Sequence, residues 1–138
     1  MNPPVEHPGT RVEPRAHAIP TETVRFPIDI PAGATVEPAI LAAFAAAGVL
    51  SGFVIMDGLA CAPLRYVMPA ASPTPDRFAW YSAPHEAQGT FLSGYMSVGR
   101  DGDNGFTHCH GHWALADGTQ AIGHLLGPES VAAEPITL

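Results

Sequence analysis

The chain contains no lysine, only two cysteines and no apolar segment long enough to cross a membrane. Its six basic residues are all arginines, and thirteen acidic residues bring the formal net charge to −7. A surface of that charge repels phosphate backbones, so direct DNA binding by this chain has poor electrostatic support. The longest apolar run, around residues 39–50, is alanine-rich and predicts a buried helix instead of a membrane span.

Cys61 and Cys109 are too few for a disulfide framework. The first residues contain no basic segment followed by an apolar core, so the sequence predicts a cytoplasmic protein whose thiols stay reduced. Cys109 stands between two histidines, and strand alternation turns it to the opposite face, where we expect a small core residue.

The composition predicts one globular domain of short elements. An apolar content of 46% over 138 residues is enough for a core, and fifteen prolines with fourteen glycines indicate many tight turns. Residues 1–20 carry five prolines and predict an extended arm, which would be ordered only if it packs on a neighbour. Residues 21–138 are expected to form the domain.

The hydrophobic pattern predicts one helix among many strands. Apolar residues alternate from Val24 to Ile30, as in a half-buried strand. Thr35 is placed to cap a helix that Gly48 ends. Residues 51–57 read as a buried strand, and further strands are expected near 64–68, 78–82, 89–98, 106–114 and 131–138. The expected fold is α+β, with a mostly antiparallel sheet of seven or eight strands and one main N-terminal helix.

His108, His110 and His112 occupy alternate positions, so their side chains share one face of an extended strand. Two histidines at i and i+2 have Cα atoms about 6.6 Å apart, which allows both rings to tilt onto one ion. Three histidines with an open coordination position are typical of catalytic or ligand-binding zinc, whereas structural zinc sites usually have four protein ligands. The pattern predicts a metal site.

His124 is the expected third ligand, on the strand that follows the Asp117-Gly118 turn. A two-residue hairpin would turn His124 away from the other histidines. A three-residue loop with a bulge, or a bulge later in the strand, would place it opposite His112 or beside His110. Gly123 is a plausible position for that irregularity.

Two readings without a metal stay open. The histidines would then belong to a polar strand that faces solvent and binds nothing, or they would stack in a row at a subunit interface.

Several segments resemble the plant-and-prokaryote-conserved domain family, called PPC or PCC. They include residues 31–35 (Pro-Ala-Gly-Ala-Thr), 47–52, 91–94, His108-Cys109-His110 and Gly123-His124-Leu125-Leu126. Together they span most of the chain from Val24 onward. The family pattern places His-x-His before an Asp-Gly turn and a Gly-Gly-His-Leu segment, and the interval from His110 to His124 agrees with it.

The resemblance implies a homotrimer in which His108, His110 and His124 bind zinc or another divalent transition metal. His112 has no counterpart in the family pattern, so it is expected to be a nearby polar group or an alternative ligand.

Plant members regulate transcription through attached AT-hooks, and many bacterial members carry a DNA-binding label. This chain has no Arg-Gly-Arg-Pro hook. The fold also resembles that of acetolactate decarboxylase, which holds zinc through histidines.

Three functions follow from these patterns. The first is a metal-binding module that holds a small ligand at the open coordination position. The second is a zinc-dependent enzyme acting on a small carbonyl or carboxylate substrate. Its candidate acid, base or anion-binding groups are Glu86, Glu134, Arg100, Tyr95 and His112. The third is a DNA-associated architectural protein, which would need a basic partner. Trp80, Tyr81 and Trp113 are expected to be core or interface residues.

Overall fold

The structure of the chain, a computed structural model, describes residues 18, 20–75, 77 and 80–138. The expected arm of residues 1–20 therefore lies almost entirely outside the described residues. Only Ala18 and Pro20 belong to both, and each is exposed and outside regular structure. The expected strand near 78–82 is described only in part, because residues 78 and 79 are not included.

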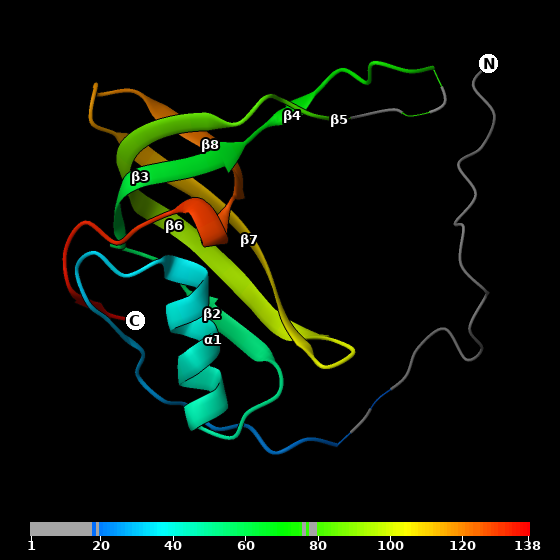
Figure 1. Cartoon of the computed structure of the whole chain (residues 1–138), viewed down its shortest axis with the longest axis vertical. Helices are drawn as coiled ribbons and strands as arrows, with labels where there is room; N and C mark the ends of the chain where they lie inside the picture. Colours follow the sequence, from blue (N-terminus) through cyan, green and yellow to red (C-terminus); the bar gives the residue numbers. More distant parts are fainter. Residues whose placement is uncertain (1–17, 19, 76, 78–79) are drawn as a thin grey trace.

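The described residues form an α+β domain with a mostly antiparallel sheet, as the sequence predicts (Figure 1). Its elements, in chain order, are β1 (Asp29–Ile30), α1 (Val36–Ala46), β2 (Gly52–Ile55), β3 (Ala60–Val67), β4 (Pro69–Ala70), β5 (Trp80–Tyr81), β6 (His85–Asp101), β7 (Asn104–Leu115), β8 (Gln120–Leu125), the 3-10 turn η1 (Gly127–Glu129) and β9 (Ile136–Thr137). Among these residues no helix is long and apolar enough to cross a membrane.

Four strands close on themselves. β6 pairs with β3 and β7, and β8 pairs with the same two strands, so every strand of the ring has two antiparallel neighbours. β2 adds to the far half of β6, which makes β2 an edge strand. A closed ring leaves few unpaired backbone groups, and it fixes the positions of β7 and β8 relative to each other.

Leu92 forms a bulge that exchanges the two faces of β6. Phe91 pairs with Trp113, whereas Ser93 pairs with His112, so Leu92 is one residue extra relative to β7. Phe91 is buried before the bulge, and the even-numbered Met96 is buried after it. Because a one-residue shift reverses which side chains face the core, Tyr95 lies on the outer face.

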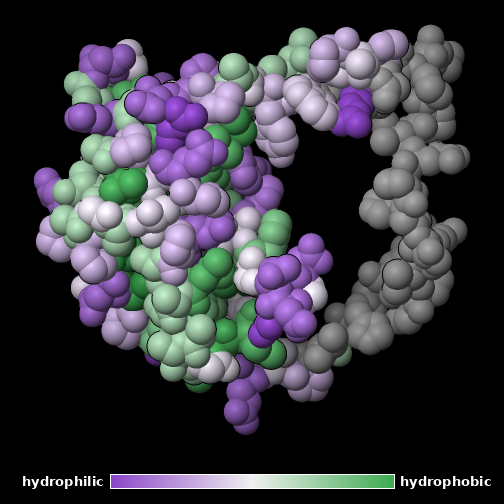
Figure 2. Space-filling view, viewed as in Figure 1, coloured by the Kyte–Doolittle hydropathy of each residue, from purple (hydrophilic) through white to green (hydrophobic). Residues whose placement is uncertain are grey.

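Helix α1 covers one face of the sheet, and it lies in front of β2 in Figure 1. Val36, Ile40 and Phe44 are buried against the sheet, at the expected helical spacing. Thr35 precedes the first turn, but its side chain makes no capping hydrogen bond; the Val36 N–H instead donates to the carbonyl of Ser130 at 3.0 Å. In the same view apolar residues gather over the helix, which exposes mostly alanines (Figure 2).

The ring encloses an aromatic core. The rings of Tyr66 and Phe91 contact Trp113 edge-on, with centroids 5.0 and 5.3 Å away. Trp113 is fully buried, which confirms its expected place in the core. Cys109 is also buried, on the face opposite the histidines, as alternation predicts. Burial raises the pKa of both Cys61 and Cys109 to about 12, so both stay as inert thiols.

Both terminal strands are shorter than expected. Of the strand predicted from Val24 to Ile30, only Asp29 and Ile30 are in β1, which pairs with β9. Ile28 exchanges backbone hydrogen bonds with Leu138, and Val24 is 61% exposed. The alternating pattern is therefore buried only where β9 supplies a partner. Of residues 131–138, only Ile136 and Thr137 form a strand, because the preceding residues make isolated bridges to other segments.

The prediction of a buried strand over residues 51–57 is wrong for one of its faces. Val54 and Met56 are buried under α1, but Phe53 and Ile55 are 71% and 60% exposed. β2 has only β6 as a neighbour, and no described element covers its outer face. The continuous apolar run therefore marks a strand with two apolar faces, one of which is open.

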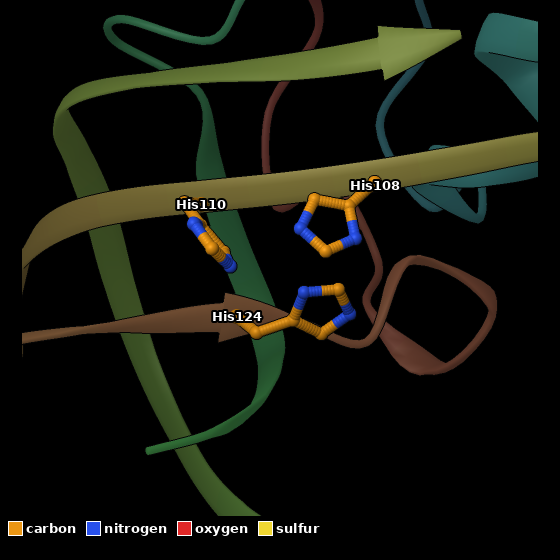
Figure 3. Close-up of side chains that lie close together, drawn as sticks. All are labelled: His108, His110 and His124. Atoms are coloured by element: carbon orange, nitrogen blue, oxygen red, sulfur yellow. The ribbon is translucent and has the colours of Figure 1, made fainter. Parts of the chain in front are cut away.

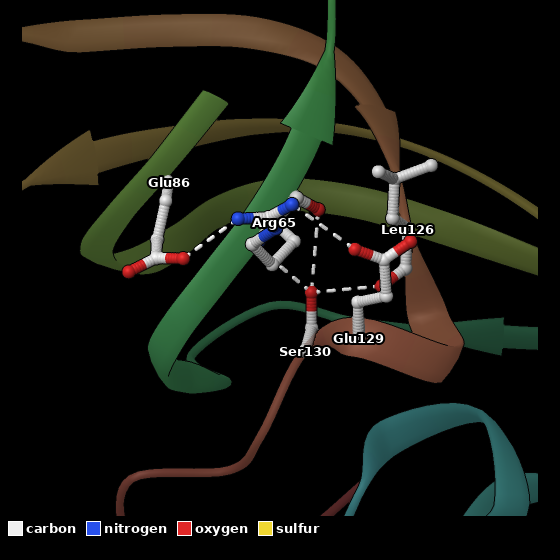
Figure 4. A network of polar contacts seen from close by, with 5 residues as sticks. All are labelled: Arg65, Glu86, Leu126, Glu129 and Ser130. Atoms are coloured by element: carbon white, nitrogen blue, oxygen red, sulfur yellow. Dashed lines mark hydrogen bonds and ion pairs between the residues drawn. The ribbon is translucent and has the colours of Figure 1, made fainter. Parts of the chain in front are cut away.

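The turn η1 is attached to β3 through Ser130, which is fully buried (Figure 4). Its Oγ accepts a hydrogen bond from the Arg65 backbone N–H at 3.0 Å and donates to the carbonyl of Leu126 at 3.0 Å or that of Arg65 at 3.2 Å. The Arg65 guanidinium bridges Glu86 at 2.7 Å and Glu129 at 3.2 Å. These carboxylates raise the pKa of Arg65, and the hydrogen bond that Arg65 donates to Glu86 has the largest effect.

Candidate metal centre

A three-residue turn decides where His124 points. Ala114 pairs with Gln120, and the Leu115 N–H donates to the Thr119 carbonyl, so the loop consists of residues 116–118. Gly118 takes a φ of +85°, a conformation that favours glycine and lets three residues close the hairpin. Of the arrangements weighed from the sequence, the three-residue loop is the one observed.

Asp117 stabilises this turn from its side chain. Its Oδ1 accepts hydrogen bonds from the Thr119 hydroxyl at 2.6 Å and the Thr119 N–H at 2.9 Å. Both bonds favour the carboxylate form and lower the pKa of Asp117. The Asp-Gly pair thus supplies a local anchor and the positive φ.

The irregularity expected at Gly123 is absent, because Gly123 pairs in register with Gly111. Gly123 matters because it allows close packing: a Cβ at this position would lie too near the carbonyl oxygen of Val67 on β3. Glycine therefore allows β3 and β8 to approach where the ring closes.

The turn places His124 directly opposite His110 on the outer face of the sheet. One cross-strand row then runs over five strands: Ile55, Tyr95, His110, His124 and Val67.

The rings of His108, His110 and His124 form one cluster (Figure 3). Ring centroids lie 4.7 Å apart for His108–His110 and for His108–His124, and 5.5 Å apart for His110–His124. One nitrogen of each ring lies within 4.8 Å of those of the other two. Tetrahedral zinc requires ligand nitrogens about 3.3 Å apart. The three nitrogens would therefore have to approach one another to hold a zinc ion.

The Nδ1 atom of His124 is the strongest indication that the cluster binds an ion. This atom is buried and makes no hydrogen bond in the part of the chain that the structure describes. Figure 3 shows this nitrogen directed into the space between the rings of His108 and His110. Burial, followed by the two neighbouring histidines, lowers the pKa of His124 and favours its neutral form. A neutral imidazole whose nitrogen points into shared space fits a metal ion.

His112 does not join the cluster. It shares the outer face, as alternation predicts, but it pairs with Ile122, and its Nε2 lies 2.8 Å from Gln120 Oε1. The three histidines that lie together therefore include His108 and His110, and the alternative ligand pair of His110 and His112 is not observed. Among the described residues no carboxylate or thiol joins the group either.

Uncharged residues flank the cluster. Tyr95 lies opposite His110, Ser97 opposite His108, and Val67 opposite His124. The ring of Tyr81 on β5 reaches His124 with a centroid distance of 6.0 Å. Sequence reasoning proposed Tyr95 as a candidate but missed Ser97 and Val67, and it read Tyr81 as a core or interface residue. The β-alternation of residues 95–97 could have indicated Ser97; only tertiary pairing brings Tyr81 to the site.

The other candidates for catalysis lie elsewhere. Glu86 is held by Arg65, and the exposed Arg100 donates to the backbone carbonyl of Asp103 in the β6–β7 turn. Glu134 is exposed in the segment before β9. None of these three is in the group of possible metal ligands.

No protein-family model matches the chain, and no curated protein matches it in sequence. In three dimensions the chain is similar to a crystal structure from Bacteroides thetaiotaomicron whose protein is described as a "putative DNA binding protein". The TM-score is 0.55 at 15% sequence identity, over 80% of this chain and 73% of the other. At this identity the likeness shows a common fold, which carries a possible three-histidine site in this chain.

Proposed function

We propose that the chain is a cytoplasmic, homotrimeric metal-binding protein of the PPC type, with zinc or another divalent transition metal held by His108, His110 and His124. One observation carries the proposal: the buried, partnerless Nδ1 of His124, which faces the rings of the other two histidines. A buried polar atom without a partner is costly, and an ion at this point would remove that cost.

The donor set favours zinc. Three imidazole nitrogens on two paired strands match the three-ligand sites in which a fourth position stays open, and a bound ion would supply Lewis acidity there. The rigid backbone pairing of His110 with His124 holds two of the three ligands in place before the ion arrives. Such preorganisation lowers the cost of binding.

Self-association is supported by the outer face of the sheet. Five large side chains on this face are more than half exposed: Phe53, Ile55, Tyr95, Phe106 and Ile122. Patches of this kind usually mark an interface. A second copy of the chain is the partner proposed here, and closed symmetry would cover the same face on every subunit. The number three comes from the PPC resemblance.

The structural neighbour's description raises DNA binding as a second role, which we propose this chain does not perform directly. A net charge of −7 and the absence of lysine leave few cations to release counterions from a duplex. A gel-shift titration against salt tests this point. Sub-micromolar duplex binding by the isolated protein at physiological salt would overturn it.

A zinc-dependent enzyme acting on a small carbonyl or carboxylate substrate is the second candidate. The open coordination position favours it. The uncharged surroundings weigh against it, because general acid–base catalysis needs a titratable group near the ion and the cluster contains no carboxylate among the described residues. The binding module is therefore our conclusion.

The metal site is tested by elemental analysis of the full chain and three variants. His110→Ala and His124→Ala are each expected to lose bound zinc, because two imidazoles are too few for tight binding. His112→Ala is the matched control, since it lies on the same face of β7 and bonds to Gln120 outside the cluster. Wild-type zinc content in His110→Ala, with the fold intact by circular dichroism, would refute the assignment.

A further inference from the structure

The charge balance of the cluster has a consequence for what binds at the ion. Three neutral imidazoles add no negative charge, and no described carboxylate or thiol completes the group. Three acids outside the group have partners of their own: Glu86 and Glu129 hold Arg65, and Asp57 Oδ1 accepts from the Gly94 N–H at 3.1 Å. A divalent ion at this site would keep both positive charges, so an external anion is favoured at its fourth position.

The flanking residues limit the charge and shape of that anion. Tyr95, Ser97 and Val67 are uncharged, so none of them would balance a second or third negative charge on a ligand. One anionic oxygen on the ion and an apolar or hydroxyl-bearing environment fit a small monocarboxylate. A phosphate group, with more charge and more acceptor oxygens, would leave several oxygens without donors.

Two tyrosines are associated with different histidines of the cluster, Tyr81 with His124 and Tyr95 with His110. Tyr81 and Tyr95 are almost equally exposed, at 56% and 55%. Of the tyrosines that the structure describes, Tyr81 alone makes a ring contact with a cluster histidine, with a centroid 6.0 Å from that of His124. The β4–β5 pairing fixes Tyr81, because it is the residue opposite Pro69 at the base of the hairpin.

We propose that the open position of the metal centre binds a small monocarboxylate, and that the Tyr81 hydroxyl donates a hydrogen bond to it. The inference rests on the proposed function, because it requires the ion. It adds the ligand class and assigns Tyr81 as the residue that determines ligand preference, two points that the three-histidine geometry alone does not contain.

The experiment uses the full chain loaded with Co²⁺, whose visible absorption reports changes of the ligands around the ion. Acetate is expected to change the spectrum in a saturable manner, whereas neutral acetamide leaves it unchanged and phosphate binds more weakly. Tyr81→Phe is expected to weaken acetate binding by about tenfold or more, the effect of one lost hydrogen bond to a charged group. Tyr95→Phe is the comparison variant: Tyr95 pairs with His110, but among the described residues its ring makes no contact with a cluster histidine, so a smaller loss than in Tyr81→Phe is expected.

The outcomes separate the two proposals. A chain that binds Co²⁺ but shows no response to acetate keeps its metal site and overturns the carboxylate inference. Phosphate binding as tight as acetate binding, or equal losses in Tyr81→Phe and Tyr95→Phe, also overturns it. A chain that takes up no Co²⁺ refutes both the metal centre and the inference built on it.

Discussion

Gly123 has no space for a side chain, because a Cβ there would lie too close to the carbonyl oxygen of Val67. The sequence suggested a different reason for this glycine, an irregular strand. The close approach matters for the site, since Val67 pairs with His124, the next residue along β8. The absence of a side chain at position 123 therefore allows β3 and β8 to pack closely beside His124, one of the proposed ligands.

Gly123→Ala is expected to destabilise the protein by roughly 1–3 kcal/mol, because backbone atoms must move to admit the methyl group. Urea unfolding measures the loss. Gly99→Ala is the control: it also lies in a strand, and a Cβ there meets nothing within 4 Å. Equal stability of the two variants would show that β3 and β8 are not as close as described.

At the scale of elements, Ser130 joins η1 to β3 and also to the start of α1. Its hydroxyl bonds to the backbones of Arg65 and Leu126, and its carbonyl accepts from the Val36 N–H. Arg65 lies near the end of β3, two residues before Val67, which pairs with His124. One buried serine thus connects three elements, one of which contains the partner of His124.

Ser130→Ala is expected to lower the free energy of unfolding by about 1–3 kcal/mol, because the Arg65 N–H loses its acceptor in a buried position. Ser72→Ala is the control, since Ser72 bonds only within its own loop, to Thr74, and should change stability by less than about 0.5 kcal/mol. Chemical denaturation of both variants tests the difference. An unchanged free energy of unfolding in Ser130→Ala would mean that another group accepts the hydrogen bond from the Arg65 N–H.

At the scale of the whole molecule, the two faces of the sheet differ in what covers them. Helix α1 covers one face (Figure 1), whereas Phe53 and Ile55 belong to the other face and are exposed. The proposed metal centre is on the uncovered face, in the same cross-strand row as Ile55. Assembly and metal binding are therefore proposed for neighbouring parts of one surface.

Ile55→Glu is expected to dissociate the assembly without unfolding the subunit, because a charge replaces an exposed apolar side chain at the proposed interface. Light scattering should show about three chain masses of 14.4 kDa for the wild type and one for the variant. Ala42→Glu, on the exposed side of α1, should remain a trimer. A wild-type monomer at micromolar concentration would contradict the trimer.

The sequence by itself determined the features that depend on local geometry. Alternation placed His108, His110 and Cys109 on their faces, and helical spacing buried Ile40 and Phe44. These patterns follow from the period of one strand or one helix, so no knowledge of neighbours is needed. The α+β class followed from the same periods together with the turn residues.

Tertiary structure decided the remainder. The position of His124 depended on a three-residue turn, and the contact of Tyr81 with His124 depended on the pairing of β4 with β5. The exposure of Ile55 depended on which face α1 covers. Register and coverage are set by contacts between segments distant in the chain, and a shift of one residue reverses a whole face. Periodicity within one segment contains no information about that choice.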